Sequence, residues 1–319
     1  MKKKLLFIAP DHYSFYKVVE DGFRKYTEYE IFTIISNGSY KYKNIDEKIK
    51  NFFMKTFLNK NLKIINAEKH CFNQVDKYKK YDTFFAIRPD ILSEETLVLA
   101  NKKSRRTIAN FWDSFEKIKG QKETMPFFDI CYSFDKEDCE NFKMNKTTNF
   151  YFNEEVIENP KFDVFFLGTF DDRFSKLVKV LENLNKFNIN ARATVFTYFK
   201  NIAIENSNKF VDYIHEIVPF QEAVHYSQNT KIVLDIQHDN QVGLSFRPFE
   251  AMGLKKKLIT TNENIRDYDF YRSNNIFIWT ENTETIPEAF FKTPYENLPK
   301  EIYEKYSLKN WVKTILAEK

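Results

Sequence analysis

The sequence predicts an α/β protein of two Rossmann-like domains that face each other across a cleft. Three observations support this fold class. The chain has 319 residues, about twice the usual length of a domain. Short apolar runs alternate with longer amphipathic stretches, which is typical of a parallel sheet covered by helices. A polar connector at 153–160 interrupts the alternation, which then starts again.

In the first half, short apolar runs predict buried strands at 5–9, 31–35, 83–87, 107–112 and 130–134. Two stretches between the second and third strands, 45–58 and 62–80, have helical spacing and Lys-rich outer faces. We expect both of these helices to cover the sheet.

The second half repeats the pattern, with strands at 163–167, 191–196, 232–236, 258–260 and 276–279 and helices near 174–187 and 221–227. We therefore assign residues 1–155 to a first domain and residues 156–319 to a second. A last helix at 308–316 carries its apolar residues on one face and could pack back on the first domain: Leu308, Trp311, Val312 and Ile315.

The charge of the chain argues against a nucleic-acid partner. The 49 Lys and Arg residues exceed the 45 Asp and Glu residues by only four, and they form no concentrated basic stripe. The small basic excess and the Lys2-Lys3-Lys4 start are compatible with peripheral contact at the inner membrane.

The sequence also favours a cytoplasmic location. The apolar run at 5–9 is too short for a signal peptide, and no run approaches the roughly 20 apolar residues of a membrane span. The three cysteines, Cys71, Cys131 and Cys139, have neither the spacing of a zinc site nor an even number for a disulfide framework.

A turn at Gly168 is the first candidate for phosphate binding. Gly168 and Thr169 end a predicted strand, and Arg173 follows just before a predicted helix. Backbone N–H groups at such a strand-to-helix turn can point at a phosphate. A simple turn glycine is the alternative, and spacing alone favours it because a lone glycine is a weak motif.

The strongest candidate for donor binding is GLSFRPFEAMGLKKKLITTN at 243–262, which follows Gln241-Val242. Gly243 lies in a polar loop, Ser245 and Arg247 lead into a short helix, and Glu250 follows one turn later. Hydrogen-bond donors and one acceptor thus meet at the carboxyl end of a parallel sheet, which suits a ribose diphosphate. The alternative is an ordinary i,i+3 ion pair between Arg247 and Glu250 on a surface helix.

This segment resembles the nucleotide-sugar segment of GT-B glycosyltransferases, in particular those of bacterial lipopolysaccharide and capsule biosynthesis. The resemblance extends to FWDS at 111–114, FDICYSFDKEDC at 128–139, FFLGT at 165–169 and YDFY at 268–271. It implies that Glu250 binds the ribose hydroxyls of a nucleotide-sugar donor. Val242 stands where retaining enzymes of the Glu-x7-Glu type carry their first glutamate, so retention or inversion stays undecided.

The resemblance implies transfer to a saccharide or lipid-linked saccharide acceptor, held by the first domain. An inverting reaction needs a base near the acceptor hydroxyl. Asp11, His12 and Asp113 follow predicted strands and are the candidates. The structural alternatives are a loop histidine bonded to backbone for His12 and a helix N-cap for Asp113.

We expect neither a cofactor nor a metal. Asp267 and Asp269 have the Asp-x-Asp form of metal-dependent transferases, but so short a motif recurs by chance. Arg247 would neutralise the leaving diphosphate, helped by Arg173 or by Lys255 to Lys257, although the lysines could equally be a solvated face. A nucleotide-sugar epimerase and a non-catalytic sugar-binding subunit are the alternative functions.

Overall fold

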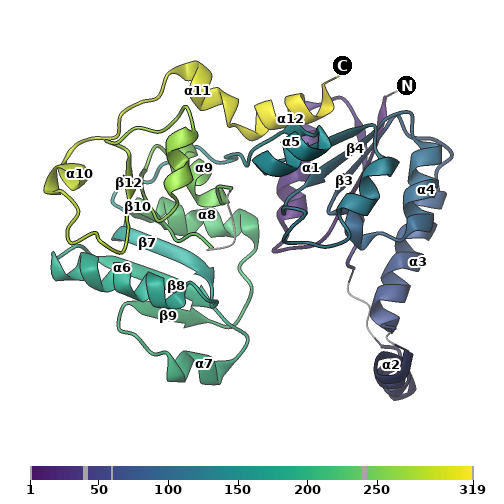
Figure 1. Cartoon of the computed structure of the whole chain (residues 1–319), viewed down its shortest axis with the longest axis horizontal. Helices are drawn as coiled ribbons and strands as arrows, with labels where there is room; N and C mark the ends of the chain where they lie inside the picture. Colours follow the sequence, from purple (N-terminus) through teal and green to yellow (C-terminus); the bar gives the residue numbers. More distant parts are fainter. Residues whose placement is uncertain (1, 39–41, 59, 239–242, 318–319) are drawn as a thin grey trace. The chain divides into compact units, whose positions relative to one another are not determined.

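The structure is a computed structural model that describes residues 2–38, 42–58, 60–238 and 243–317. It divides into two compact units, Met1–Thr147 and Thr148–Lys319. Among the described residues, each unit contains one six-stranded parallel sheet with helices on its faces (Figure 1). Residues 148–155, which the sequence assigned to the first domain, belong to the second unit.

Unit 1 has the strand order β2-β1-β3-β4-β5-β6. In chain order its elements are β1 (Lys4–Ala9), α1 (Phe15–Tyr26), β2 (Glu30–Ile35), α2 (Ile45–Leu58), α3 (Leu62–Asp76), β3 (Thr83–Ile87), η1 (Pro89–Ile91), α4 (Glu94–Lys103), β4 (Thr107–Phe111), η2 (Lys122–Phe127), β5 (Ile130–Ser133), α5 (Lys136–Phe142) and β6 (Asn145–Lys146).

The central strands of unit 1 form because their apolar runs can be buried on both faces of the sheet. Every residue of β3 and β4 is buried, and only Lys4 of β1 is not. Phe7 of β1 packs against Phe23 of α1 and Phe85 of β3, with ring centroids 5.3 and 5.8 Å apart. The strands predicted for this half are confirmed.

The helices α2 and α3 form where the sequence predicts helices, but α2 does not cover the sheet. α3 contributes Cys71 and Val75 to the core of unit 1. α2 buries only Asn51 among its described residues. The side-chain amide of Asn51 donates to the Tyr42 hydroxyl at 2.6 Å, and its oxygen accepts from the Leu62 backbone N–H at 2.7 Å. The expected orientation of α2 is therefore wrong, because these polar contacts turn its apolar face outward.

Unit 2 has the strand order β12-β11-β10-β7-β8-β9. Its elements are β7 (Phe162–Thr169), α6 (Phe174–Lys186), β8 (Ala191–Phe196), α7 (Lys200–Glu205), β9 (Val211–Ile214), α8 (Phe220–Gln228), β10 (Thr230–Asp235), α9 (Phe246–Gly253), β11 (Lys257–Thr260), η3 (Glu263–Asp267), β12 (Ile276–Ile278), α10 (Glu288–Lys292), α11 (Lys300–Lys305) and α12 (Leu308–Leu316).

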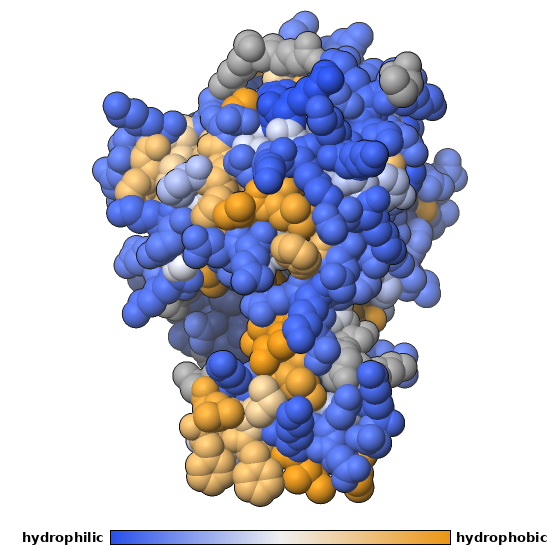
Figure 2. All heavy atoms as spheres, turned by 90° about the vertical axis from the view of Figure 1, so that its right-hand side faces the viewer, coloured by the Kyte–Doolittle hydropathy of each residue, from blue (hydrophilic) through white to orange (hydrophobic). Residues whose placement is uncertain are grey.

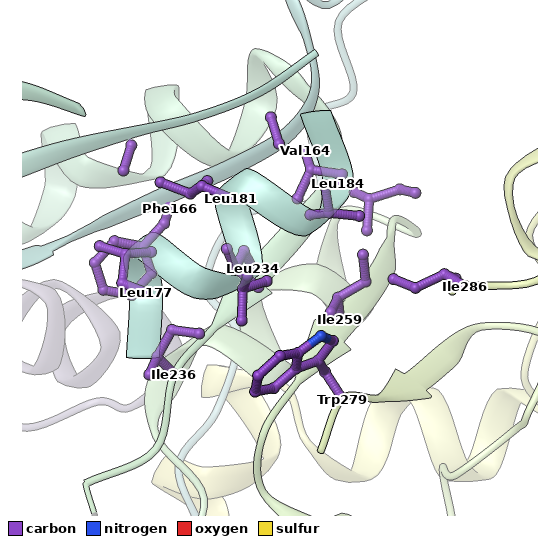
Figure 3. Close-up of a cluster of buried hydrophobic side chains, with 14 of the residues drawn as sticks. Val164, Phe166, Leu177, Leu181, Leu184, Leu234, Ile236, Ile259, Trp279 and Ile286 are labelled. Atoms are coloured by element: carbon purple, nitrogen blue, oxygen red, sulfur yellow. The ribbon is translucent and has the colours of Figure 1, made fainter. Parts of the chain in front are cut away.

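One core of unit 2 lies between its sheet and α6 (Figure 3). The buried residues of α6 are Leu177, Val180, Leu181 and Leu184, and this spacing places them on one helical face. They pack with apolar side chains of the strands and with Trp279, including Val164, Phe166, Leu234 and Ile259. Residues from distant parts of the sequence thus hold the carboxyl ends of β7 and β10 in place.

The first and last segments of unit 2 are joined. The Tyr151 N–H donates to the Tyr306 carbonyl at 2.9 Å, and the Leu308 N–H donates to the Tyr151 carbonyl at 2.8 Å. Gly253 makes room for this contact, because a Cβ there would lie 2.6 Å from the Tyr151 side chain.

In the described part of the chain, no helix is both long enough and apolar enough to cross a membrane.

Candidate active site

The predicted donor-binding residues gather where the strand order of unit 2 reverses. The chain passes from β7 through β8 to β9 and then returns to the other side of β7 with β10. In open α/β sheets, ligands bind beyond the carboxyl ends of the strands at such a reversal. These ends are Leu167–Thr169 in β7 and Asp235 in β10.

Arg247 and Glu250 connect α9 to the end of β7. Arg247 Nη1 donates to Glu250 Oε2, and Nη2 donates to the Leu167 carbonyl at 3.3 Å. The Ser227 hydroxyl donates to the same glutamate oxygen at 2.8 Å. The two charged side chains are only 19% and 10% exposed. The ion pair that was the surface alternative therefore exists, but Glu250 is buried and Arg247 is half-buried, and the pair lies at the strand-order reversal.

Ser245 starts α9 and ties it to β10. Its hydroxyl accepts from the Arg247 backbone N–H at 3.1 Å and donates to Asp235 Oδ1 at 2.8 Å. The other oxygen of Asp235 accepts from the Thr260 hydroxyl at 2.7 Å. The sequence analysis gave Asp235 no role. An acidic residue that ends an apolar strand was the available signal, because a buried carboxylate needs hydrogen-bonding partners.

Arg173 forms a second bridge between β7 and β10. Its Nε and Nη2 donate to the two oxygens of Asp171 at 2.9 and 2.6 Å, and its Nη1 donates to the Ile236 carbonyl at 2.9 Å. Gly168 has a packing reason of its own, because a Cβ there would lie 2.5 Å from the Phe166 ring. The exposed Thr169 ends the strand.

Gly243 is the first described residue after 238, and Gln241 and Val242 lie outside the described residues. The Gly243 carbonyl accepts from the Asn262 side-chain amide at 3.2 Å. Asn262 follows β11, so this contact holds the polar loop at the carboxyl edge of the sheet. The predicted donor-binding residues thus lie in or contact the segments at the carboxyl ends of β7, β10 and β11: Gly168, Thr169, Arg173, Gly243, Ser245, Arg247 and Glu250.

The three lysines proposed as helpers of Arg247 lie at the opposite edge of the sheet. Lys255 and Lys256 precede the amino end of β11, and Lys257 begins it. Lys256 and Lys257 are buried, and their ammonium groups donate to carbonyls near the ends of α8 and α10, at Gln228 and Phe290. Cations stabilise helix carboxyl termini in this way. Both readings of the lysines, as diphosphate ligands and as a solvated face, are wrong for Lys256 and Lys257.

Two places in unit 2 have carboxylates that are candidates for metal binding. Asp269 accepts from Lys305 Nζ at 2.6 Å and from the Tyr306 hydroxyl at 2.7 Å, so its oxygens have partners within the fold. In the described ranges, Asp171, Asp172 and His238 offer ligand atoms within 4.8 Å of one another. Both oxygens of Asp171 already accept from Arg173, whose hydrogen bonds and charge hold the pKa of this carboxyl below its usual range despite burial.

Unit 1 gathers its predicted residues at the equivalent place, where the strand order reverses between β1 and β3. Arg88 follows β3 and donates to both oxygens of Asp90 at 2.8 and 2.7 Å. Its Nη1 lies 3.6 Å from Asp113 Oδ2. The other oxygen of Asp113 accepts from Lys117 Nζ at 2.6 Å. Arg88, which was not among the predicted site residues, thus contacts both Asp90 and Asp113.

His12 lies among these charges. Partial burial lowers the pKa of His12 most, the Arg88 charge lowers it further, and Asp113, Asp11 and Asp90 oppose the shift. A lowered pKa keeps the imidazole neutral near pH 7, which is the form that can accept a proton. Asp11 is less available, because its Oδ1 accepts from the Ser14 backbone N–H at 2.8 Å.

The backbone around His12 is unusual. Tyr13, Ser14 and Arg88 have φ of 53°, 59° and 55°, which lie in the left-handed region that favours glycine. Such conformations cost free energy and cluster at functional sites. Their position beyond β1 and β3 agrees with a ligand site at this edge of unit 1.

No protein-family model matches the chain, and no curated protein matches its sequence. Solved structures match its fold. The Anabaena protein Alr3699/HepE, solved in complex with UDP and glucose, aligns over 100% of both chains with a TM-score of 0.55 and 10% identity. The fold is of the GT-B type. A UDP-N-acetylglucosamine 2-epimerase also matches, over 99% of this chain and 95% of its own, with a TM-score of 0.53 and 11% identity.

The GT-B fold therefore includes both a protein solved with UDP and glucose and an epimerase of a UDP-sugar. Such low identities show the fold and leave the reaction to be argued from the site. In this chain the GT-B fold places Arg247, Glu250 and Ser245 at the strand-order reversal of unit 2. It places His12, Arg88 and Asp113 at that of unit 1.

Proposed function

We propose that this protein is a glycosyltransferase that moves a sugar from a nucleotide-sugar donor to a saccharide or lipid-linked saccharide acceptor in lipopolysaccharide or capsule biosynthesis. The observation that carries the proposal is the partly buried Arg247–Glu250 pair at the start of α9, at the carboxyl ends of β7 and β10. The complex of Alr3699/HepE with UDP and glucose supports a UDP-sugar as the donor.

Each donor-site residue has a chemical role in this proposal. The Glu250 carboxylate accepts hydrogen bonds from the ribose hydroxyls, while its ion pair holds the Arg247 guanidinium at the strand ends. Arg247 and the N–H groups at the start of α9 meet the diphosphate, whose charge grows as the bond to the sugar breaks. The proposed reaction needs neither a metal nor a cofactor.

Unit 1 supplies the acceptor site in this proposal. If the reaction inverts, the neutral imidazole of His12 takes the proton of the attacking hydroxyl, and Asp113 and Asp90 stabilise the imidazolium that forms. Arg88 positions both carboxylates through its contacts with them. The proposed location is cytoplasmic, with peripheral contact at the membrane where lipid-linked acceptors lie.

The experiment that tests the proposal has two steps. A thermal-shift series with nucleotides and nucleotide sugars should identify the donor, because a ligand of the folded state raises apparent stability. That donor is then incubated with lipid-linked and free saccharide acceptors, and the products are separated. Sugar transfer supports the proposal. Ligand binding without either transfer or donor hydrolysis would indicate a non-catalytic binding subunit.

An epimerase is the second candidate, because a UDP-N-acetylglucosamine 2-epimerase has the same fold at a TM-score of 0.53. Such a reaction requires no acceptor. NMR of the donor after incubation with the protein alone separates the two candidates, since only an epimerase converts the sugar into its epimer. A changed sugar configuration without acceptor would overturn the transferase.

A further inference from the structure

The outward face of α2 has an unusual composition for a protein surface. Seven of the sixteen exposed large apolar side chains of the described residues lie within 45–64. Five of them, Ile45, Ile49, Phe52, Phe53 and Phe57, occupy one side of α2 at helical spacing. Phe52 is 64% and Phe57 72% exposed. Figure 2 shows apolar side chains gathered at the lower end of the molecule, where α2 lies in Figure 1.

The fold itself holds this apolar face outward. Asn51 on the opposite side of α2 is buried and hydrogen-bonded to Tyr42 and Leu62. Phe53 and Phe57 stack with ring centroids 5.9 Å apart. A helix that turns its polar side toward its own protein and its apolar side outward needs another apolar partner.

Basic side chains border the apolar face, and Asp46 lies on that face at the start of α2. Residues 43–63 contain six lysines and two acidic residues, a net charge of +4 that equals the net charge of the whole chain. By helical spacing, Lys48 and Lys55 flank one side of the apolar face and Lys50 flanks the other. All three are exposed. Phe and Ile beside a border of lysines are typical of helices that lie in the headgroup region of an anionic bilayer.

We propose that α2 docks this protein on an anionic phospholipid surface, with the face formed by Ile45, Ile49, Phe52, Phe53 and Phe57 inserted at the boundary between headgroups and acyl chains. The lysines then lie at headgroup level, where each contributes an attraction to anionic lipid. A second copy of the chain fits less well, because a twofold contact through this face would bring two sets of lysines together. Docking would bring the proposed transferase to a lipid-linked acceptor. Only this purpose rests on the proposed function, whereas the docking itself rests on the residues of α2.

Vesicle flotation of the full-length protein tests the proposal. Vesicles of phosphatidylcholine alone are compared with vesicles that contain about one-third phosphatidylglycerol. The wild-type protein should float with the anionic vesicles only, and added salt should weaken this binding. The double variant Phe53→Ser/Phe57→Ser should lower the partition coefficient at least about tenfold. Lys48→Glu/Lys55→Glu should lower it by a similar factor or more.

Matched controls come from unit 2. Phe187 and Phe199 are also exposed, and Lys186 and Lys200 adjoin them in sequence. Phe187→Ser/Phe199→Ser and Lys186→Glu/Lys200→Glu should float like the wild type. Nucleotide binding, measured on each variant, reports the donor site separately. If an α2 variant loses flotation but binds nucleotide normally, only the membrane contact of α2 has been removed. If the wild type binds no nucleotide, the proposed function fails and the docking proposal is unaffected.

Four results would overturn the proposal. The wild type could fail to float with anionic vesicles, or float equally well with both kinds. The Phe53→Ser/Phe57→Ser variant could float like the wild type. Light scattering could show a dimer of the wild type that this variant loses, which would make a second copy the occupant of the face.

Discussion

The guanidinium of Arg247 and the carboxylate of Glu250 form a partly buried ion pair one helical turn apart, and the same guanidinium donates to the Leu167 carbonyl near the carboxyl end of β7. Buried pairs are costly to break, because the remaining charge loses its partner. The pair therefore positions two groups of opposite sign at one strand end. A nucleotide diphosphate needs both, an acceptor for its ribose hydroxyls and a cation for its phosphates.

Glu250→Ala should weaken nucleotide binding by roughly 1.5–3 kcal/mol, the range for hydrogen bonds to charged groups. Calorimetry on the folded variant measures this. Glu250→Gln is the matched control, because it retains an acceptor oxygen and should lose less. Since both variants remove the charge that faces Arg247, their melting temperatures must be recorded too. If a folded Glu250→Ala protein binds nucleotide with unchanged affinity, Glu250 does not bind the ribose hydroxyls.

Arg247→Ala should lower turnover more than it lowers affinity for the intact donor. The reason is that negative charge on the diphosphate grows as it departs, so the lost guanidinium matters most in the transition state. Steady-state kinetics gives kcat, and calorimetry gives donor affinity. Equal losses in both would show that Arg247 contributes only to ground-state binding.

His12→Ala and Asp113→Asn should leave nucleotide binding almost unchanged, because both residues belong to unit 1. If His12 or Asp113 is the base, its variant should transfer sugar about a hundredfold more slowly or worse, the usual scale of general-base catalysis. His70→Ala is the control, since His70 is exposed on α3. If both variants transfer sugar at the wild-type rate, a retaining mechanism, or Asp11 as the base, becomes the better hypothesis.

The pH dependence of transfer should reflect the lowered pKa of His12. A base works when neutral, so kcat/KM should fall as pH drops through a value below the ordinary 6.5 of histidine. Arg88→Gln should move this acid limb to higher pH. It removes a charge that disfavours the imidazolium and releases Asp90 and Asp113, which favour it. If the acid limb of the variant lies at the same pH as that of the wild type, the pH profile of kcat/KM does not report the ionisation of His12.

Transfer should persist in EDTA, because Arg247 and the start of α9 meet the diphosphate in the proposed mechanism. Activity with and without chelator, and after return of manganese or magnesium, checks this. If a metal restores lost activity, Asp171, Asp172 and His238 would be the first residues to substitute. Asp269, which is bonded to Lys305 and Tyr306, would be the less suitable ligand.

The strands were predictable, because buried parallel strands leave contiguous apolar runs. The edge of the unit 2 sheet was predictable because Gly168 ends one such run, while Ser245 and Arg247 lie in the connection between two others. Asp235 was not found, since its importance lies in contacts with Ser245 and Thr260 that are distant in sequence. Arg88 likewise depends on Asp113, which belongs to another strand.

Two errors have a common cause. Helical spacing correctly placed α2, but spacing does not say which side of a helix faces the protein, and one buried Asn51 decided it. Lys256 and Lys257 looked solvated or phosphate-binding, but they donate to carbonyls at Gln228 and Phe290. In both cases a few polar contacts from elsewhere in the fold override the local pattern.

The hydrogen bonds of Tyr151 with Tyr306 and Leu308 tie the first segment of unit 2 to the residues that precede and begin α12. The two segments therefore depend on each other for their backbone hydrogen bonds. A truncation before Tyr306 would remove both backbone partners of Tyr151 as well as α12, so the segment at Tyr151 and the segment at 306–316 should be lost or kept together.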